Sequence, residues 1–98
     1  MNIQAMMKQA QKLQADMMKE KNAIDDEIFT SKSSFVSVEM KGNKELKKVS
    51  IEAEKLDKED IEMLEDIILV AINDTINQIN KKTEEKMGKY TKGMPGLF

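Results

Sequence analysis

The chain has 98 residues, with 16 lysines against 18 acidic residues and a net charge of -2, which fits one small domain. It contains no Cys and no His, which excludes disulfides, Cys/His zinc sites, thiol nucleophiles and histidine acid–base catalysis. It opens without a secretion signal, and no stretch approaches the ~18 apolar residues of a membrane span. We therefore expect a cytoplasmic protein with no membrane partner.

The charge is distributed unevenly along the chain. Residues 1–24 carry a net charge of +2 and residues 81–92 carry +3, whereas residues 25–80 carry -7. Two basic ends around an acidic middle favour interaction with a polyanion, although most charge runs are solvated helix faces. Every basic residue is Lys, a point charge suited to phosphates, which argues against direct reading of base edges. An A·T-rich coding bias explains the lack of Arg equally well.

Residues 2–27 are predicted to form one long helix. Apolar residues recur at the three- and four-residue spacing of a heptad stripe, and no Gly or Pro interrupts them. The stripe consists of Ile3, Met6, Ala10, Leu13, Met17 and Ile24. It is too long for the core of so small a chain, so we expect a partner helix from a second subunit to cover it. Lys8, Lys12 and Lys19 lie on the face turned away from this stripe.

The segment 28–53 changes to the two-residue period of β structure. Apolar and polar residues alternate over residues 35–40 and again over residues 46–52, with a turn at residues 41–44 between them. A shorter strand is expected at residues 28–32, where β-favouring residues follow the first helix. The middle of the chain therefore predicts a small antiparallel sheet of two to three strands.

Residues 57–92 are predicted to form the second long helix. Asp57 is followed three residues later by a second Asp, which resembles a capping box. Apolar residues then follow helical spacing as far as Ile79, so we expect this half to lie between the sheet and a partner subunit. Beyond Ile79 the sequence is polar and rich in Lys. We expect residues 80–92 to project past the core as an arm, and residues 93–98 to form a tail.

The apolar faces of the two helices predict a homodimer. Its expected interface consists of Ile3, Met6, Ala10, Leu13, Met17, Leu64, Ile68 and Ile72. Lys82, Lys86 and Lys89 share one face of the second helix because they are four and seven residues apart. Two basic helix faces, each doubled in a dimer, can follow the phosphates on both sides of a duplex. Such contacts do not depend on base sequence and weaken strongly with salt.

No catalytic constellation is predicted. Adjacent acidic pairs such as Glu65-Asp66 and Glu84-Glu85 diverge around a helix, so their carboxylates do not converge as a catalytic dyad would. No phosphate-binding glycine loop accompanies them. The sequence therefore predicts a protein that is not an enzyme, with no cofactor, no metal site and no small-molecule substrate.

Several segments resemble the YbaB/EbfC family of bacterial nucleoid-associated proteins. They are residues 7–14 (MKQAQKLQ), residues 63–66 (MLED) with Ala71, Asn73 and Asp74 after them, residues 86–88 (KMG) and residues 93–98 (GMPGLF). The similarity runs in order over nearly the whole chain, as one domain of residues 1–98. The chain departs from the family's usual Gly-rich stretch at residues 32–35 and from its usual Pro at residues 53–54, which leaves the turn geometry open.

The resemblance implies an α+β protomer of helix, sheet and helix, and a tweezer-like homodimer whose projecting helices embrace double-stranded DNA. It implies a role in organising the bacterial nucleoid, with links to gene regulation or to recombination and repair. By position it assigns DNA binding to Lys8, Lys12, Lys19, Lys81, Lys82, Lys86, Lys89 and Lys92. Lys19 is the weakest of these assignments because it lies nearer the core.

A function of a different class is also compatible with two long helices around a β-hairpin. Prefoldin-like chaperones share that layout, and Met-rich helix tips can grip unfolded clients. The broad apolar face of the second helix and its basic tip weigh against a chaperone. A coiled-coil adaptor that binds no nucleic acid is the third alternative.

Overall fold

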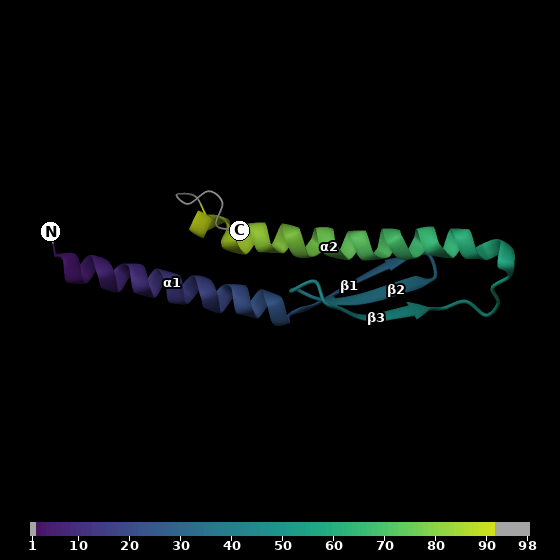
Figure 1. Ribbon diagram of the computed structural model, residues 1–98, viewed down its shortest axis with the longest axis horizontal. Coiled ribbons are helices and arrows are strands. Elements are labelled where there is room, and N and C mark those ends of the chain that lie inside the picture. The colour runs from purple at the N-terminus through teal and green to yellow at the C-terminus, as the bar shows by residue number, and fades with distance from the viewer. Residues whose placement is uncertain (1, 92–98) are drawn as a thin grey trace.

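The structure is a computed structural model that describes residues 2–91. In chain order the elements are α1 (Ile3–Asp26), β1 (Ile28–Ser33), β2 (Val36–Lys41), β3 (Leu46–Ile51), the short 3-10 helix η1 (Lys58–Asp60) and α2 (Ile61–Thr91). The predicted α+β class, with two long helices around a small antiparallel sheet, is confirmed. Figure 1 shows that α1 and the sheet lie end to end beside α2, so the protomer is long and thin.

The three strands form one antiparallel sheet in the order β1-β2-β3. Val38 lies opposite Val49, so their side chains share one face of the sheet. The register shifts between Glu39 and Met40, and Met40 then lies opposite Leu46. This irregularity interrupts the strict alternation expected along the third strand, and it places Leu46 on the same face as Val49.

The core lies between α2 and the first two strands, and it has two parts. One part buries Val36, Val38 and Ala71, with half-buried Leu64, Ile67, Ile68 and Ile72 packed around them. The other part buries Ile24, Phe29, Met40, Ile79, Met87 and Tyr90. Since Ile24 belongs to α1 while Met87 and Tyr90 belong to α2, the second cluster holds the two helices together.

Hydrogen bonds to the β2–β3 turn fix the C-terminal end of α1. The Gly42 N–H donates to the carbonyl oxygen of Glu27 at 2.9 Å, and the Asn43 N–H donates to that of Asp25 at 3.3 Å. Such carbonyls have no partner inside the helix itself. A Cβ at Gly42 would overlap the carbonyl oxygen of Ile24, so only glycine fits there. The base of α1 is therefore attached directly to the sheet.

The helix that projects past the core is α1. Residues 2–16 are exposed throughout, and they continue beyond the last described turn of α2 (Figure 1). The expectation that residues 80–92 project is wrong, because Met87 and Tyr90 are buried against α1. The radius of gyration is 19.5 Å, against about 13 Å for a compact domain of this length. The fold thus exposes far more surface than a globular chain of the same size.

Candidate nucleic-acid interface

The outer part of α1 is a basic arm, which we define as residues 3–19. Its lysines are Lys8, Lys12 and Lys19, and its only acidic residue is Asp16. The spacing of the three lysines places them on one face, and all three side chains are exposed. Within the described part of the chain none of them forms an ion pair. The arm therefore offers three exposed positive charges on one side of a helix, with Asp16 nearby.

The opposite face of the arm is apolar and largely uncovered. Its exposed residues are Ile3, Met6, Ala10 and Leu13, which are four of the residues predicted for the dimer interface. A shallow groove of about 420 Å³ runs along Met6, Gln9, Ala10 and Leu13. Met17 differs from the rest of the stripe because it packs against the core cluster shared with α2. The stripe is thus divided between the protomer core and open surface.

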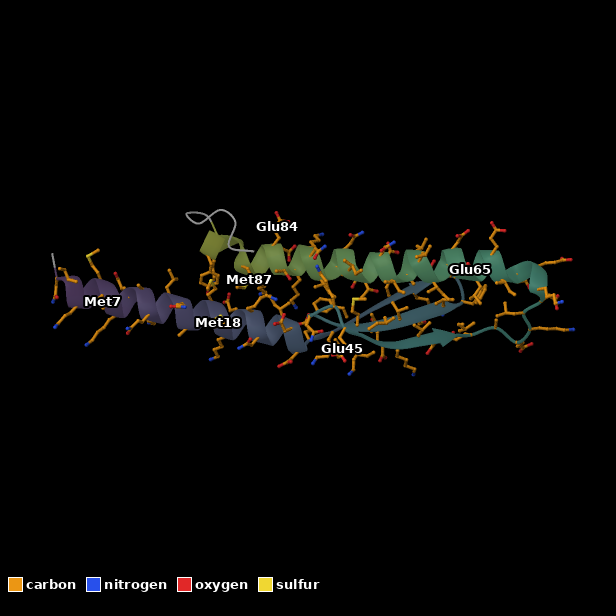
Figure 2. The ribbon with its side chains drawn as sticks, viewed as in Figure 1. Met7, Met18, Glu45, Glu65, Glu84 and Met87 are labelled. Atoms are coloured by element: carbon orange, nitrogen blue, oxygen red, sulfur yellow. The ribbon has the colours of Figure 1, made fainter. Side chains whose placement is uncertain are left out.

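The predicted lysine face of α2 turns towards α1. Lys82 Nζ lies 2.7 Å and 2.9 Å from the two carboxylate oxygens of Glu27, at the end of α1. The ammonium also lies 5.9 Å from the centroid of the Phe29 ring, a cation–π distance. The Lys82 ammonium is therefore paired within the chain, in a partly exposed position. Figure 2 shows Met87 on the α1 side of α2 and Glu84 on the far side.

Lys89 forms the second ion pair between the helices. Its Nζ lies 3.3 Å from Oε1 of Glu20 and 5.0 Å from the centroid of the Tyr90 ring. The hydrogen bond from Lys89 to Glu20, and then the charge attraction between them, raise the pKa of Lys89 above its ordinary value. The other carboxylate oxygen of Glu20, Oε2, is buried without a hydrogen-bond partner in the described structure. This pair is looser than that of Lys82, because the Lys89 side chain is 64% exposed against 36% for Lys82.

The remaining predicted lysines of α2 have different surroundings. Lys86 is exposed and lines a pocket of about 220 Å³ between the helices, together with both paired acids. Lys81 is exposed and forms no ion pair with a described residue, but exposed Glu84 and Glu85 follow it on the helix. Lys92 and the predicted tail, residues 93–98, lie outside the described residues. The outward surface of α2 is thus mixed in charge, unlike the arm.

The acidic partners on α1 are the functional residues that sequence reasoning missed. Glu20 and Glu27 are seven residues apart on α1, and so are Lys82 and Lys89 on α2. Going back seven residues from Glu27 to Glu20 corresponds to going forward seven residues from Lys82 to Lys89, as expected for an antiparallel helix pair. That matched spacing is the signal in the sequence for these two ion pairs.

The dimer residues predicted on α2 contribute to the protomer core. Leu64, Ile68 and Ile72 are half-buried against the sheet, so only part of each side chain is available to another subunit. Other apolar side chains are more exposed than these. On the sheet they are Leu46, Val49 and Ile51, and on α2 they are Ile61, Met63, Leu69 and Val70. The strand residues are uncovered because α2 packs over β1 and β2, and β3 forms the sheet edge beyond it.

Residues 2–91 hold neither a metal cluster nor a candidate membrane span. The described residues contain no group of three or more His, Cys, Asp or Glu side chains arranged to hold a metal ion. None of the described helices combines the length and apolar character needed to cross a membrane. The candidate site therefore consists of the basic arm, the lysines of α2 and the acids paired with them.

Comparison with known sequences assigns the chain to a family. The sequence profile of the YbaB/EbfC DNA-binding family matches residues 1–94. A nucleoid-associated protein from Lactococcus lactis subsp. cremoris is 46% identical over 97 residues, which cover 97% of this chain and 98% of the relative. A nucleoid-associated protein from Ligilactobacillus salivarius is 40% identical over 99 residues, which cover 99% of this chain and 95% of the relative.

A solved structure shares the fold. The crystal structure of an uncharacterized protein from Helicobacter pylori superposes with a TM-score of 0.75, covers 92% of this chain and 97% of its own, and is 23% identical. The fold of this chain therefore has a counterpart in a crystal structure. On the profile match and the two close relatives, the chain belongs to the YbaB/EbfC DNA-binding family.

Proposed function

We propose that this protein binds double-stranded DNA as a homodimer, through phosphate contacts that depend little on base sequence. The binding surface is the basic arm, with Lys8 and Lys12 at its centre and Lys19 at its inner end. Lys81, Lys86 and Lys92 of the second helix are the further candidates. Lys82 and Lys89 were also predicted from the sequence, but their ion pairs make them poorer phosphate ligands than the lysines of the arm.

The observation that carries the proposal is the arm itself. Its residues as far as Asp16 are exposed and extend past the body of the protomer, and its net charge is positive. No packing against the other described residues explains the length of this exposed helix. A row of lysines on a projecting helix is the arrangement that neutralises DNA phosphates and releases their counterions. Most of the acidic residues lie outside the arm, at residues 25–27 and between residue 54 and the middle of α2.

Independence from base sequence follows from the side chains available. The chain has no Arg, so the bidentate contact to guanine that most often confers specificity is missing. Only 4% of its residues are aromatic, and the one Tyr is buried, so base stacking on exposed rings is not supported. Lysine contacts to phosphate position a protein on the duplex without reading its sequence.

The homodimer is supported by the uncovered apolar surface. Large apolar side chains are exposed on the arm, on β3 and on α2, which is unusual for a monomer. The protomer measures 71 × 21 × 14 Å, so it is too thin to bury these faces by itself. A second copy that covers them would also place two basic arms on one particle, which doubles the phosphate contacts.

The relatives' names suggest the cellular setting. Proteins 40–46% identical to this chain are named nucleoid-associated proteins. We infer that this protein acts on the bacterial chromosome, where it contributes to nucleoid organisation and, through it, to gene regulation or to recombination and repair.

A titration of the full-length protein on random-sequence duplex DNA, at several salt concentrations, tests the proposal. The logarithm of affinity is expected to fall linearly with the logarithm of salt concentration, with a slope of about -0.9 per phosphate contacted. A second duplex of unrelated sequence is expected to bind with similar affinity. If no complex forms at low salt, the proposed function is wrong. Suppressed aggregation of an unfolded client, unaffected by salt, would instead support the prefoldin-like chaperone.

A further inference from the structure

Two ion pairs connect α1 to α2 at matched positions. The inner pair joins Glu27 to Lys82 with both carboxylate oxygens engaged, and the outer pair joins Glu20 to Lys89 through one oxygen. The outer pair lies two helical turns further along both helices, where the arm leaves the body of the protein. The chain belongs to a DNA-binding family, yet both of these lysines pair with acidic residues of the same chain.

Few other contacts hold α1 in place. Ile24 is its only buried residue among those described, and Met17 is half-buried on the same cluster. The β2–β3 turn and an ion pair between Lys41 and Asp26, at 3.6 Å, fix its last turn, but the exposed residues 2–16 can swing about this base. From Glu20 to Ile3 the arm extends about 25 Å at 1.5 Å per residue. A small change of angle at the base therefore displaces the tip by several ångströms.

We propose that Glu20, Glu27, Lys82 and Lys89 are positioning residues, which fix the direction of the basic arm, and that Lys82 contacts Glu27 in place of DNA. Only the effect of these residues on DNA affinity rests on the proposed function. Its structural part, that the pairs hold the arm at one angle, applies to the free protein. The inner pair is the stronger of the two because it is the shorter and the less exposed.

Loss of the acidic residue Glu27 is expected to weaken DNA binding, which is opposite to the usual effect of removing a negative charge. A carboxylate near a DNA site repels phosphate, so its removal normally raises affinity. If Glu27 restrained a DNA-binding lysine, Glu27→Gln would release Lys82 and tighten the complex. If Glu27 positions the arm, the same substitution loosens it, and affinity falls although the protein has become less acidic. The direction of this one change separates the two mechanisms.

The first experiment measures the arm without DNA. Because the chain has no cysteine, Gln11→Cys on the arm and Asn80→Cys on α2 give two clean spin-label sites on exposed residues. The labelled chain is diluted into unlabelled protein, so that distances within one chain dominate. A single narrow distance distribution is expected, which broadens in Glu27→Gln and in Lys82→Gln. Lys81→Gln removes the same charge from the neighbouring position and is expected to leave the distribution narrow.

A charge swap adds a rescue test. Glu27→Lys combined with Lys82→Glu restores the pair with its polarity reversed and leaves the net charge unchanged. The swapped protein is expected to regain the narrow distribution that each Gln variant loses. A distribution that stays narrow in both Gln variants, or a swap that remains broad while it folds as judged by circular dichroism, would overturn the structural part of the proposal.

The second experiment measures DNA affinity and its salt dependence for the same proteins. Glu27→Gln and Lys82→Gln are expected to weaken binding roughly threefold, within the range of one partly exposed ion pair, with the salt slope unchanged. Tighter binding by Glu27→Gln, or a salt slope that falls by about 0.9 in Lys82→Gln as for a lost phosphate contact, would contradict the positioning role. If the parent protein does not bind DNA at all, the proposed function fails, while the distance measurements still test the ion pairs.

Discussion

Gly42 is the single residue on which the base of α1 depends most directly. Its N–H binds the carbonyl oxygen of Glu27, and its lack of a side chain lets the turn approach the backbone of Ile24. The atoms that a Cβ would meet first belong to the backbone of a helix, which cannot move aside as a flexible side chain can. The turn and the helix end would have to separate to accept any larger residue.

Gly42→Ala is therefore expected to destabilise the protein by about 3 kcal/mol, the upper end of the range for overpacked sites. Gly88→Ala is the matched control, because a Cβ there meets no atom within 4 Å and Ala favours the helix interior. It is expected to stabilise the protein by up to about 1 kcal/mol. Urea unfolding of the two variants measures both values. Equal effects of the two substitutions would mean that the turn does not contact α1 as described.

The ion pair of Lys89 makes the stability of the protein depend on pH at alkaline values. Its pKa is raised by Glu20, so the folded protein holds this proton more tightly than the unfolded chain does. The resulting stability is fully present below the ordinary pKa of 10.5 and is lost as the pH rises through the higher folded value. The difference in unfolding free energy between the parent and Lys89→Gln is expected to be constant near neutral pH and to shrink above pH 10.5. A difference that grows with alkaline pH would contradict this pair.

At the scale of elements, the packing of α2 on α1 depends on a short apolar contact. Met87 is almost fully buried among side chains from both helices and the sheet, whereas Met7 is 56% exposed on the arm. Met87→Ala is expected to cost about 2–4 kcal/mol through lost contacts and a cavity. Met7→Ala is expected to change stability by less than about 0.5 kcal/mol, as exposed sites generally do. Thermal unfolding of both variants compares the same substitution at a packed and an open position.

The elements themselves were predictable because their signals are local. Heptad spacing, two-residue alternation and the turn at residues 41–44 locate two helices and two strands within a few residues of their observed bounds, and β propensity suggests the third strand, at residues 28–32. Spacing also placed Lys82, Lys86 and Lys89 on one face of α2. Which way that face turns depends on how the two helices pack, and periodicity does not contain this information. The pairing of Lys82 with Glu27, 55 residues away, is therefore visible only in the fold.

The same limit explains the error about residues 80–92. Residues 80–92 are polar overall, which suggested a free arm, but Met87 and Tyr90 are enough to bury one side of this helix. The stripe on the first helix suggested a buried face, but its outer half extends past the last described turn of α2. Apolar content indicates that a helix face is buried, and it does not indicate whether residues of the same chain or of another subunit bury it.

At the scale of the whole molecule, the uncovered face of β3 makes the oligomeric state testable. Val49 is 40% exposed and lies on the face of the sheet that carries the core. Val49→Lys is expected to shift the protein from a dimer towards a monomer of 11.2 kDa in light scattering, because a charge would be buried in the interface. Thr30→Lys adds the same charge to an exposed position on the opposite sheet face and is expected to remain dimeric. Dimers in both variants would place the interface elsewhere, such as the apolar stripe of the arm.

The most direct measurement of the central claim is the salt dependence of duplex DNA binding by a protein with a neutral arm. Lys8→Gln with Lys12→Gln removes two charges from the arm. Lys55→Gln with Lys58→Gln removes two from exposed positions between β3 and α2, a segment that lies at the end of the molecule away from the arm (Figure 1). The arm variant is expected to bind more weakly, with a log–log salt slope reduced in magnitude by about 1.8, or two phosphate contacts. The far-end variant is expected to keep the slope of the parent. An arm variant that matches the parent in affinity and slope would contradict DNA binding by the arm.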